Sequence, residues 1–220
     1  MHAPDQMAMP MPVAWGVQEL AALFTMWAVM MIAMMLPSAA PMILLFAAAN
    51  RTRRIHGRPV VSTAVFTAGY LLAWSVYSAV AALAQLALHD AALLSPMMTS
   101  ATPALGGTLL IAAGVYQWTA LKRTCLAHCR SPLTFLSSEW REGRLGALRM
   151  GATHGTYCVG CCWALMALLF VAGVMNLLWV AAIAGFVLVE KLVPGGEWVG
   201  RLAGAALVGW GGWVLLWRGS

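Results

Sequence analysis

The sequence predicts an all-α, polytopic membrane protein with about six transmembrane helices, and three observations support this prediction. Hydrophobic residues make up 62% of the 220 residues, and charged residues only 9%. The mean hydropathy is +0.81. Since a soluble domain carries about 25% charged residues, this chain cannot cover itself with a hydrated surface. Third, apolar runs long enough to cross a bilayer are separated by short polar segments. Residues 18–217 are therefore expected to form a single transmembrane domain.

The first half of the chain contains three predicted spans. A Pro-broken, Met-rich tail over residues 1–17 precedes a span at about 18–49. Pro37 and Pro41 lie inside this span, where proline removes a backbone donor and clashes with the preceding turn, so a kink is expected. The second span, about 60–88, ends before His89 and Asp90, and the third, about 103–121, stops at Lys122.

Three more spans are expected in the second half, after a polar segment at about 122–149. They cover about 150–173, 174–191 and 198–217. Tryptophans at the end of the last span suit an interfacial belt. Gly196, Gly200 and Gly204 repeat at four-residue spacing, which favours close helix contact, although single glycines are also common in membrane helices.

The basic residues indicate the orientation. Four arginines follow the first span, and the segment after the third span carries Lys122, Arg123 and further arginines. The tail and the connections after the second and fourth spans carry no Lys or Arg. Because positive charge is retained in the cytoplasm, both termini are expected outside the cytoplasmic membrane and the basic loops inside. The net charge of +6 is thus attributed to topology and anionic lipid, and no nucleic-acid partner is expected.

One stripe of polar and sulfur side chains marks the fourth span. His154, Cys158, Cys161 and Cys162 lie at positions i, i+4, i+7 and i+8, and therefore share one helix face. Imidazole and thiol groups inside an apolar helix suit a soft metal ion or thiol redox chemistry.

A second cluster follows the third span. Cys125, His128 and Cys129 lie at i, i+3 and i+4, so a helix or tight turn would bring them together. With the stripe of the fourth span they could supply one metal site. The alternative is that buried cysteine serves as a small apolar side chain.

Two further features are weaker candidates for a metal path. The first span contains Met26, Met30 and Met34 in one row, and Met31 and Met35 in a second. Thioethers bind Cu(I), but such rows also simply fill gaps between helices. Glu190 ends the fifth span as a possible ligand or, more in keeping with its neighbours, as an ion-pair partner of Lys191 or Arg201.

Several of these segments resemble a known family. They are the run from Tyr116 to Pro132, the run from His154 to Met166, and the shorter segments Ala33–Ala39, Gly173–Asn176 and Glu190–Leu192. They are similar to a bacterial family of predicted metal-binding integral membrane proteins, over most of the chain from the first span onward. The resemblance implies a polytopic inner-membrane protein that binds metal, with Cys125, Cys129, His154, Cys158, Cys161 and Cys162 at the matching positions. It implies no particular metal.

Taken together, the sequence predicts a protein of the bacterial inner membrane that transfers or delivers a soft ion, Cu(I) first and Zn(II) second. No ATP-binding loop is present, and no catalytic residue is expected. A thiol–disulfide oxidoreductase using Cys158/Cys161 and Cys125/Cys129 is the alternative, although these cysteines are expected to face the reducing cytoplasm. A structural subunit of a larger membrane complex is a third possibility. The expected partners are the lipid bilayer and a membrane protein or a second copy of the chain.

Overall fold

The computed structural model describes residues 16–57, 59–93 and 102–218, and all regular secondary structure in these ranges is helical. The helices are α1 (Val17–Ile55), α2 (Thr63–Asp90), α3 (Pro103–Tyr116), α4 (Ala120–Arg130), α5 (Pro132–Glu139), α6 (Gly143–Ala167), α7 (Leu169–Ala172), α8 (Leu177–Leu192) and α9 (Gly196–Arg218). The all-α prediction is confirmed. Most of the predicted Met-rich tail lies outside the described residues, and Val17 already belongs to α1.

Each of the six predicted spans contains a helix, but the helices differ in length. Within the described ranges, α1, α2, α6 with α7, and α9 are long and apolar enough to cross a membrane. The bent pair α3 and α4, with 62° between them, could act as a fifth span. Helix α8 has only 16 residues. Six complete spans therefore stay a prediction.

The segment at about 122–149 folds differently from the polar connection expected there. It contains α4, α5 and the beginning of α6. Thr119 caps α4 by accepting a hydrogen bond from the backbone of Lys122 at 3.3 Å, and Pro132 occupies the first turn of α5, where a missing N–H costs nothing. As a result, the second cysteine cluster lies on a helix with a defined face.

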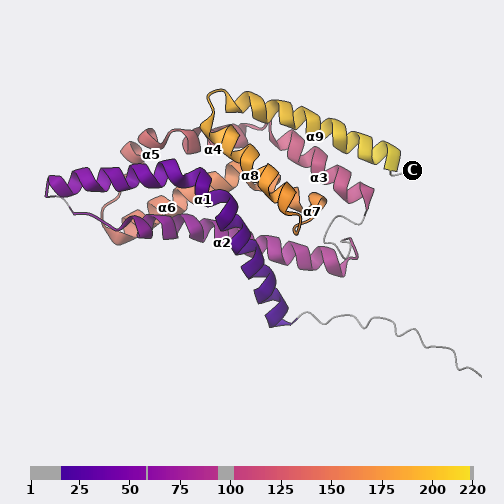
Figure 1. The fold of residues 1–220 in the computed structure, drawn as a ribbon, viewed down its shortest axis with the longest axis horizontal. Coiled ribbons are helices and arrows are strands. Elements are labelled where there is room, and N and C mark those ends of the chain that lie inside the picture. Colours follow the sequence, from indigo (N-terminus) through magenta and orange to yellow (C-terminus); the bar gives the residue numbers. More distant parts are fainter. Residues whose placement is uncertain (1–15, 58, 94–101, 219–220) are drawn as a thin grey trace, which may run out of the picture.

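Helix α1 continues through both of its prolines, Pro37 and Pro41. Its ribbon changes direction along its length in Figure 1. Proline leaves the carbonyl four residues earlier without its helical donor. The assignment of this turn to the two prolines stays a prediction.

Helix α6 is the centre of the arrangement, and it packs on α2 with the two backbones in contact. A Cβ atom added to Gly151 would lie 1.9 Å from the carbonyl oxygen of Phe66, and one added to Gly69 would lie 2.0 Å from that of Leu148. Only glycine permits this approach. The contact sets the buried face of α6 against the aromatic side chains of α2.

A second pair of helices, α3 and α9, also packs with close backbone contact at glycines. A Cβ atom on Gly114 would lie 2.7 Å from the carbonyl oxygen of Gly204, and one on Gly211 would lie 2.7 Å from that of Gly107. The close helix contact expected from the glycine repeat of the last span is confirmed at Gly204. Nearer the start of α9, Gly200 lies against the carboxylate of Glu190.

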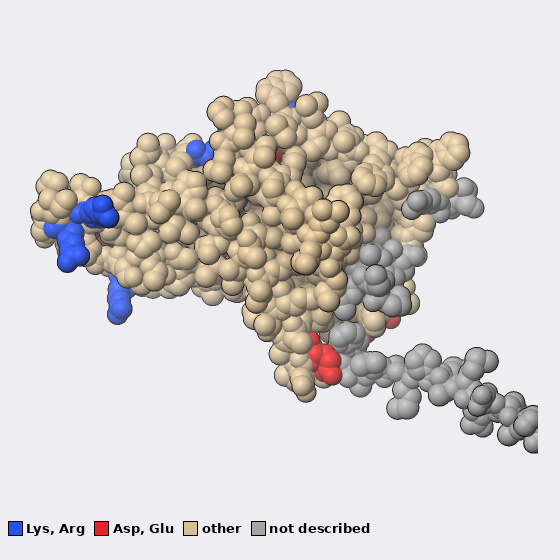
Figure 2. Space-filling view, viewed as in Figure 1, with Lys and Arg blue, Asp and Glu red and all other residues tan. Residues whose placement is uncertain are grey.

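The basic segments after the first and third predicted spans lie at the same end of the molecule. Arg53, near the end of α1, forms an ion pair with Glu142 and lies over the ring of Trp140. Figure 2 shows Lys and Arg side chains at this end of a surface that is otherwise largely uncharged. The segments that the charge pattern assigns to one side of a membrane are thus neighbours in space.

We expect Gly151→Ala to destabilise the protein by about 1–3 kcal/mol, the usual cost of overpacking a tight contact. The added methyl group has no space beside the Phe66 carbonyl, so α2 and α6 must separate. Thermal unfolding of the detergent-solubilised protein measures the change. Gly185→Ala in α8 is the matched control, because no atom lies within 4 Å of its added Cβ. Equal stability of the two variants would contradict the backbone contact.

Candidate metal centre

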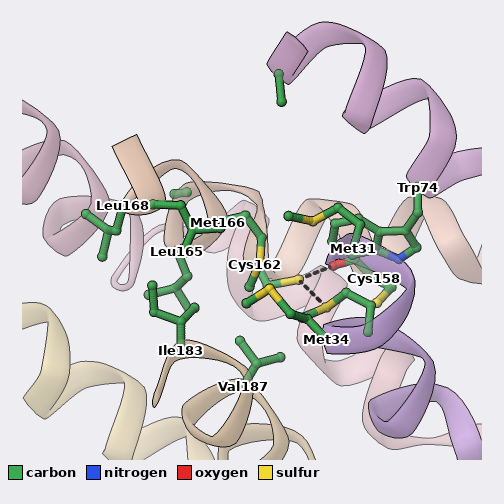
Figure 3. Close-up of a cluster of buried hydrophobic side chains, with 14 of the residues drawn as sticks. Met31, Met34, Trp74, Cys158, Cys162, Leu165, Met166, Leu168, Ile183 and Val187 are labelled. Atoms are coloured by element: carbon green, nitrogen blue, oxygen red, sulfur yellow. Dashed lines mark hydrogen bonds between the residues drawn. The ribbon is translucent and has the colours of Figure 1, made fainter. Parts of the chain in front are cut away.

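The predicted stripe of α6 forms one buried face. His154 is 3% exposed, and Cys158, Cys161 and Cys162 are each 1% exposed. The four residues, which the helical spacing places on one face of α6, are therefore all buried in the protein interior. In Figure 3, Cys158 and Cys162 lie among methionine and other apolar side chains from several helices.

Helix α4 brings the second cysteine cluster to α6, as expected. The Sγ atoms of Cys129 and Cys161 are 4.0 Å apart. Cys125, one turn earlier on α4, lies against Gly160, where a Cβ atom would be 2.7 Å from its sulfur. All five cysteines are free thiols. The α4–α6 contact thus unites the two sequence motifs in one sulfur cluster.

Cys158 is the most connected thiol of the cluster. Its Sγ atom accepts a hydrogen bond from the Nζ atom of Lys191 at 2.9 Å and lies 3.1 Å from the hydroxyl oxygen of Tyr70. The thiols of Cys161 and Cys162 donate to the carbonyl oxygen of Cys158 at 3.1 and 2.8 Å. A thiolate at Cys158 would therefore be paired with a buried ammonium group.

One of the predicted methionines joins the thiols directly. The Sδ atom of Met35 lies 3.8 Å from the Sγ atom of Cys162. Met31 and Met34 of α1 and Met166 of α6 are also buried near Cys162 (Figure 3). Met26 and Met30, earlier on α1, are partly buried and pack against the same core. The methionine rows of α1 therefore lead to the cysteine cluster.

The two candidate histidines differ in burial and in their partners. His128 is exposed on α4, where its Nδ1 atom donates to the carbonyl oxygen of Thr124 at 2.8 Å. Its ring stacks on that of Tyr157 with 4.2 Å between centroids. His154 packs against the rings of Phe66, Tyr70 and Phe135, and its buried Nδ1 atom has no hydrogen-bond partner. Neither imidazole belongs to a close sulfur pair.

Glu190 lies outside the sulfur cluster, with an ion-pair partner that the sequence did not indicate. Its Oε2 atom accepts a hydrogen bond from the Nζ atom of Lys122 at 2.8 Å, and both side chains are buried. The expected pairing with Lys191 or Arg201 is wrong, because Lys191 turns to Cys158 and Arg201 lies over the ring of Trp198. The other carboxylate oxygen, Oε1, has no hydrogen-bond partner.

Sequence reasoning missed Lys191 as a member of the site. The sequence indicates it only as a possible ion-pair partner of Glu190. The available signal was its place at the end of an apolar run, because an ionisable residue there usually has a functional partner. Ser38, which accepts from Lys191 at 3.2 Å, and Tyr70 carry no such signal in their spacing.

The sulfur separations suit a soft ion. With metal–sulfur bonds of about 2.3 Å, two sulfurs on one metal are about 3.8 Å apart in a tetrahedral site and about 4.0 Å apart in a trigonal one. Met35–Cys162 and Cys129–Cys161 have these separations. Among the described residues, no three His, Cys, Asp or Glu side chains already converge on one point. The arrangement therefore offers preformed sulfur pairs, and a metal would draw further ligands to it.

Thiol oxidation tests the short distance between the sulfur atoms of Cys129 on α4 and Cys161 on α6. Diamide should oxidise Cys129 and Cys161 to an intramolecular disulfide, with the two thiols supplying the electrons that reduce diamide, because a modest side-chain movement brings the sulfurs into bonding range. Peptide mass spectrometry identifies the bond. It should persist in Cys125→Ser and disappear in Cys129→Ser. A Cys125–Cys129 bond in its place would overturn the orientation of α4.

Comparison with known proteins assigns the chain to a family. No curated protein and no solved structure matches it. A family model described as PpoB2, copper chaperone, matches residues 24–214, which include all five cysteines and the methionine rows of α1. This match supports copper-related metal handling, in agreement with the metal-related family expected from the sequence motifs. Because the match covers most of its length, the chain belongs to the PpoB2 copper chaperone family.

Proposed function

We propose that this protein is a membrane-embedded copper chaperone that receives Cu(I) on thioethers of α1 and passes it to thiolates held between α4 and α6. The contact between Met35 and Cys162, 3.8 Å between their sulfur atoms, is the observation that carries the proposal. It joins a row of neutral thioether ligands to a cluster of stronger thiolate ligands. An ion moving from Met to Cys would gain affinity at this step.

The membrane location rests on the surface of the helices as well as on their length. Along α2, Leu72, Val76 and Val80 follow one another at four-residue spacing and are 54–61% exposed. A continuous apolar ridge of this kind suits lipid and is costly in water. We assign the protein to the bacterial inner membrane with both termini outside the cytoplasm, as the basic loops indicate.

The ligand types favour Cu(I) over Zn(II). Structural zinc sites take four cysteine or histidine ligands in a closed tetrahedron, and thioethers are not among the usual zinc ligands. Here a methionine contacts a cysteine, while His128 and His154 lie outside the close sulfur pairs. Sulfur-only coordination is typical of Cu(I). Copper is therefore the cargo that the described side chains fit best.

The direction of transfer follows from the placement of the ligands. Methionine does not form disulfides, so thioethers suit the oxidising outer side, whereas free thiols suit the reducing inner side. The row from Met26 through Met30 and Met34 starts near the beginning of α1, on the proposed outer side. We therefore infer inward transfer, from this row to the cysteines.

A thiol–disulfide oxidoreductase is the second candidate, and the Cys129–Cys161 separation of 4.0 Å favours it. This pair joins α4 to α6, whereas each pair expected from sequence lies within one helix. Such an enzyme needs an electron acceptor such as a quinone. Reduced protein that transfers no electrons to a soluble quinone, yet binds copper, would separate the two candidates.

Copper binding is the direct test of the proposal. The protein purified under reducing conditions should bind about one Cu(I) per chain, and X-ray absorption should show a shell of sulfur without nitrogen. We expect Met35→Leu and Cys162→Ser to weaken Cu(I) binding by roughly tenfold or more, the loss of one good ligand. Competition with a chromophoric Cu(I) chelator measures the affinity.

Met42→Leu is the control for Met35→Leu. Met42 is an equally buried methionine of α1, but it belongs to a separate core cluster with Phe46 and Phe66. Its replacement should leave Cu(I) affinity unchanged. A wild-type protein without stoichiometric copper, or a nitrogen-rich metal shell, would contradict the proposed function.

Membrane topology provides an independent test. Reporter fusions after Arg54 and after Arg144 should report the cytoplasm, and a fusion after Asp90 should report the periplasm, because the first two positions lie in basic segments and the third in a connection without Lys or Arg. The opposite pattern would place the thiols on the oxidising side and favour the oxidoreductase.

A further inference from the structure

Lys191 is a buried cation with an unusual partner. Its side chain is 7% exposed, and its Nζ atom donates to the Sγ atom of Cys158 at 2.9 Å and to the Oγ atom of Ser38 at 3.2 Å. Among the described residues, no carboxylate forms an ion pair with it. The nearest carboxylate in sequence, Glu190, pairs with Lys122. The sulfur cluster therefore holds the counter-charge of Lys191.

The position of this cation is fixed from both sides. Glu190 ties the end of α8 to Lys122 of α4, and the Arg130 side chain donates to the carbonyl oxygens of Glu190 and Val193 at 3.1 and 2.8 Å. Because neighbouring helical residues point about 100° apart, these contacts turn Lys191 toward α6. The lysine thus cannot move its charge to the surface without breaking the end of α8.

We propose that Lys191 determines the charge of the ion that the sulfur cluster accepts, selecting monovalent over divalent ions. The inference rests on the proposed binding of a soft metal at the cysteines. The ammonium group lies 2.9 Å from the sulfur of Cys158 and repels any cation bound beside it. At the same distance a divalent ion meets twice the repulsion that a monovalent ion meets. Low-dielectric surroundings screen this repulsion poorly, so a buried site disfavours the extra charge.

The other described groups that contact Lys191 or Cys158 are neutral, since Ser38 and Tyr70 offer hydroxyl groups. The adjacent Lys122–Glu190 pair is neutral as a unit and adds no net charge. Met35 adds a ligand without charge. Lys191 is therefore the one described side chain beside the thiols whose charge decides the balance.

The ammonium group also orients the ligand. It donates to the sulfur of Cys158 from the side of α8, and a thiolate sulfur retains further lone pairs for a metal. Ser38 accepts from the same ammonium and donates to the carbonyl oxygen of Met35 at 2.9 Å. Lys191 thus connects the thiolate helix to the segment of α1 that carries the thioether ligand.

The test compares two soft closed-shell ions that differ in charge, Ag(I) and Cd(II). Wild-type protein in detergent should prefer Ag(I), measured by direct competition under reducing conditions. Lys191→Met should lower the ratio of Ag(I) to Cd(II) affinity by tenfold or more, since removing the ammonium group relieves a divalent ion of more repulsion than a monovalent one. Lys191→Arg retains the charge and should retain the ratio.

A double variant, Lys122→Met with Glu190→Gln, is the matched control. It removes the buried ion pair between α4 and the same end of α8 without changing the net charge, while the hydrogen bonds of Arg130 to the carbonyl oxygens of Glu190 and Val193 still hold that end. The ratio should stay at the wild-type value. An altered ratio would mean that packing of α8, and not the charge of Lys191, sets the preference.

The outcomes distinguish this inference from the proposed function. If wild-type protein binds Cu(I) and Ag(I) but Lys191→Met keeps the wild-type ratio, the copper function stands and the charge selection is wrong. If wild-type protein prefers Cd(II), charge selection fails without any variant, even when Lys191→Met does not fold. If wild-type protein binds no soft ion, the proposed function itself fails.

Discussion

The contact between Lys191 and Cys158 joins the parts of this structure that matter for its chemistry. Cys158 belongs to α6, Lys191 to α8, and both reach α1 and α2 through Ser38 and Tyr70. A buried ammonium group needs a partner, since the loss of water is costly in an apolar interior. Here the partner is a thiol instead of a carboxylate. One contact therefore both stabilises the buried ammonium group and sets the electrostatic environment of the sulfur cluster.

Close backbone packing makes this contact reachable. Gly69, Gly151 and Gly155 let α2 and α6 approach until side chains have no room between them. The aromatic and sulfur residues next to these glycines then meet directly, with the hydroxyl oxygen of Tyr70 3.1 Å from Cys158. In the proposed membrane setting the hydrophobic effect adds little between helices, so close contact and buried hydrogen bonds would supply the association. The glycines and the polar groups are thus complementary parts of the same packing.

The choice of sulfur over nitrogen ligands has a spatial basis. His128 precedes Cys129 directly and His154 lies one helical turn before Cys158, yet His128 stacks on Tyr157 and His154 packs among three aromatic rings. Met35, more than 100 residues away from the cysteines of α6 in sequence, contacts Cys162 instead. The sulfur cluster lies within the part of the chain that matches the copper chaperone family. The family relation and the side-chain chemistry thus point to the same class of metal.

Much of this arrangement could be predicted from the sequence, because helical periodicity is local. Composition and long apolar runs determined an all-helical chain, and spacing alone placed Cys158, Cys161 and Cys162 on one buried face. The association of this face with Cys129 was also predictable, since α4 and α6 are close in the chain. Only the tertiary structure decided how α4 and α8 are rotated about their axes. That rotation turns His128 outward, pairs Glu190 with Lys122 and aims Lys191 at Cys158. A buried charge takes its partner from whichever helix packs beside it, and this choice depends on contacts between distant segments that no local pattern records.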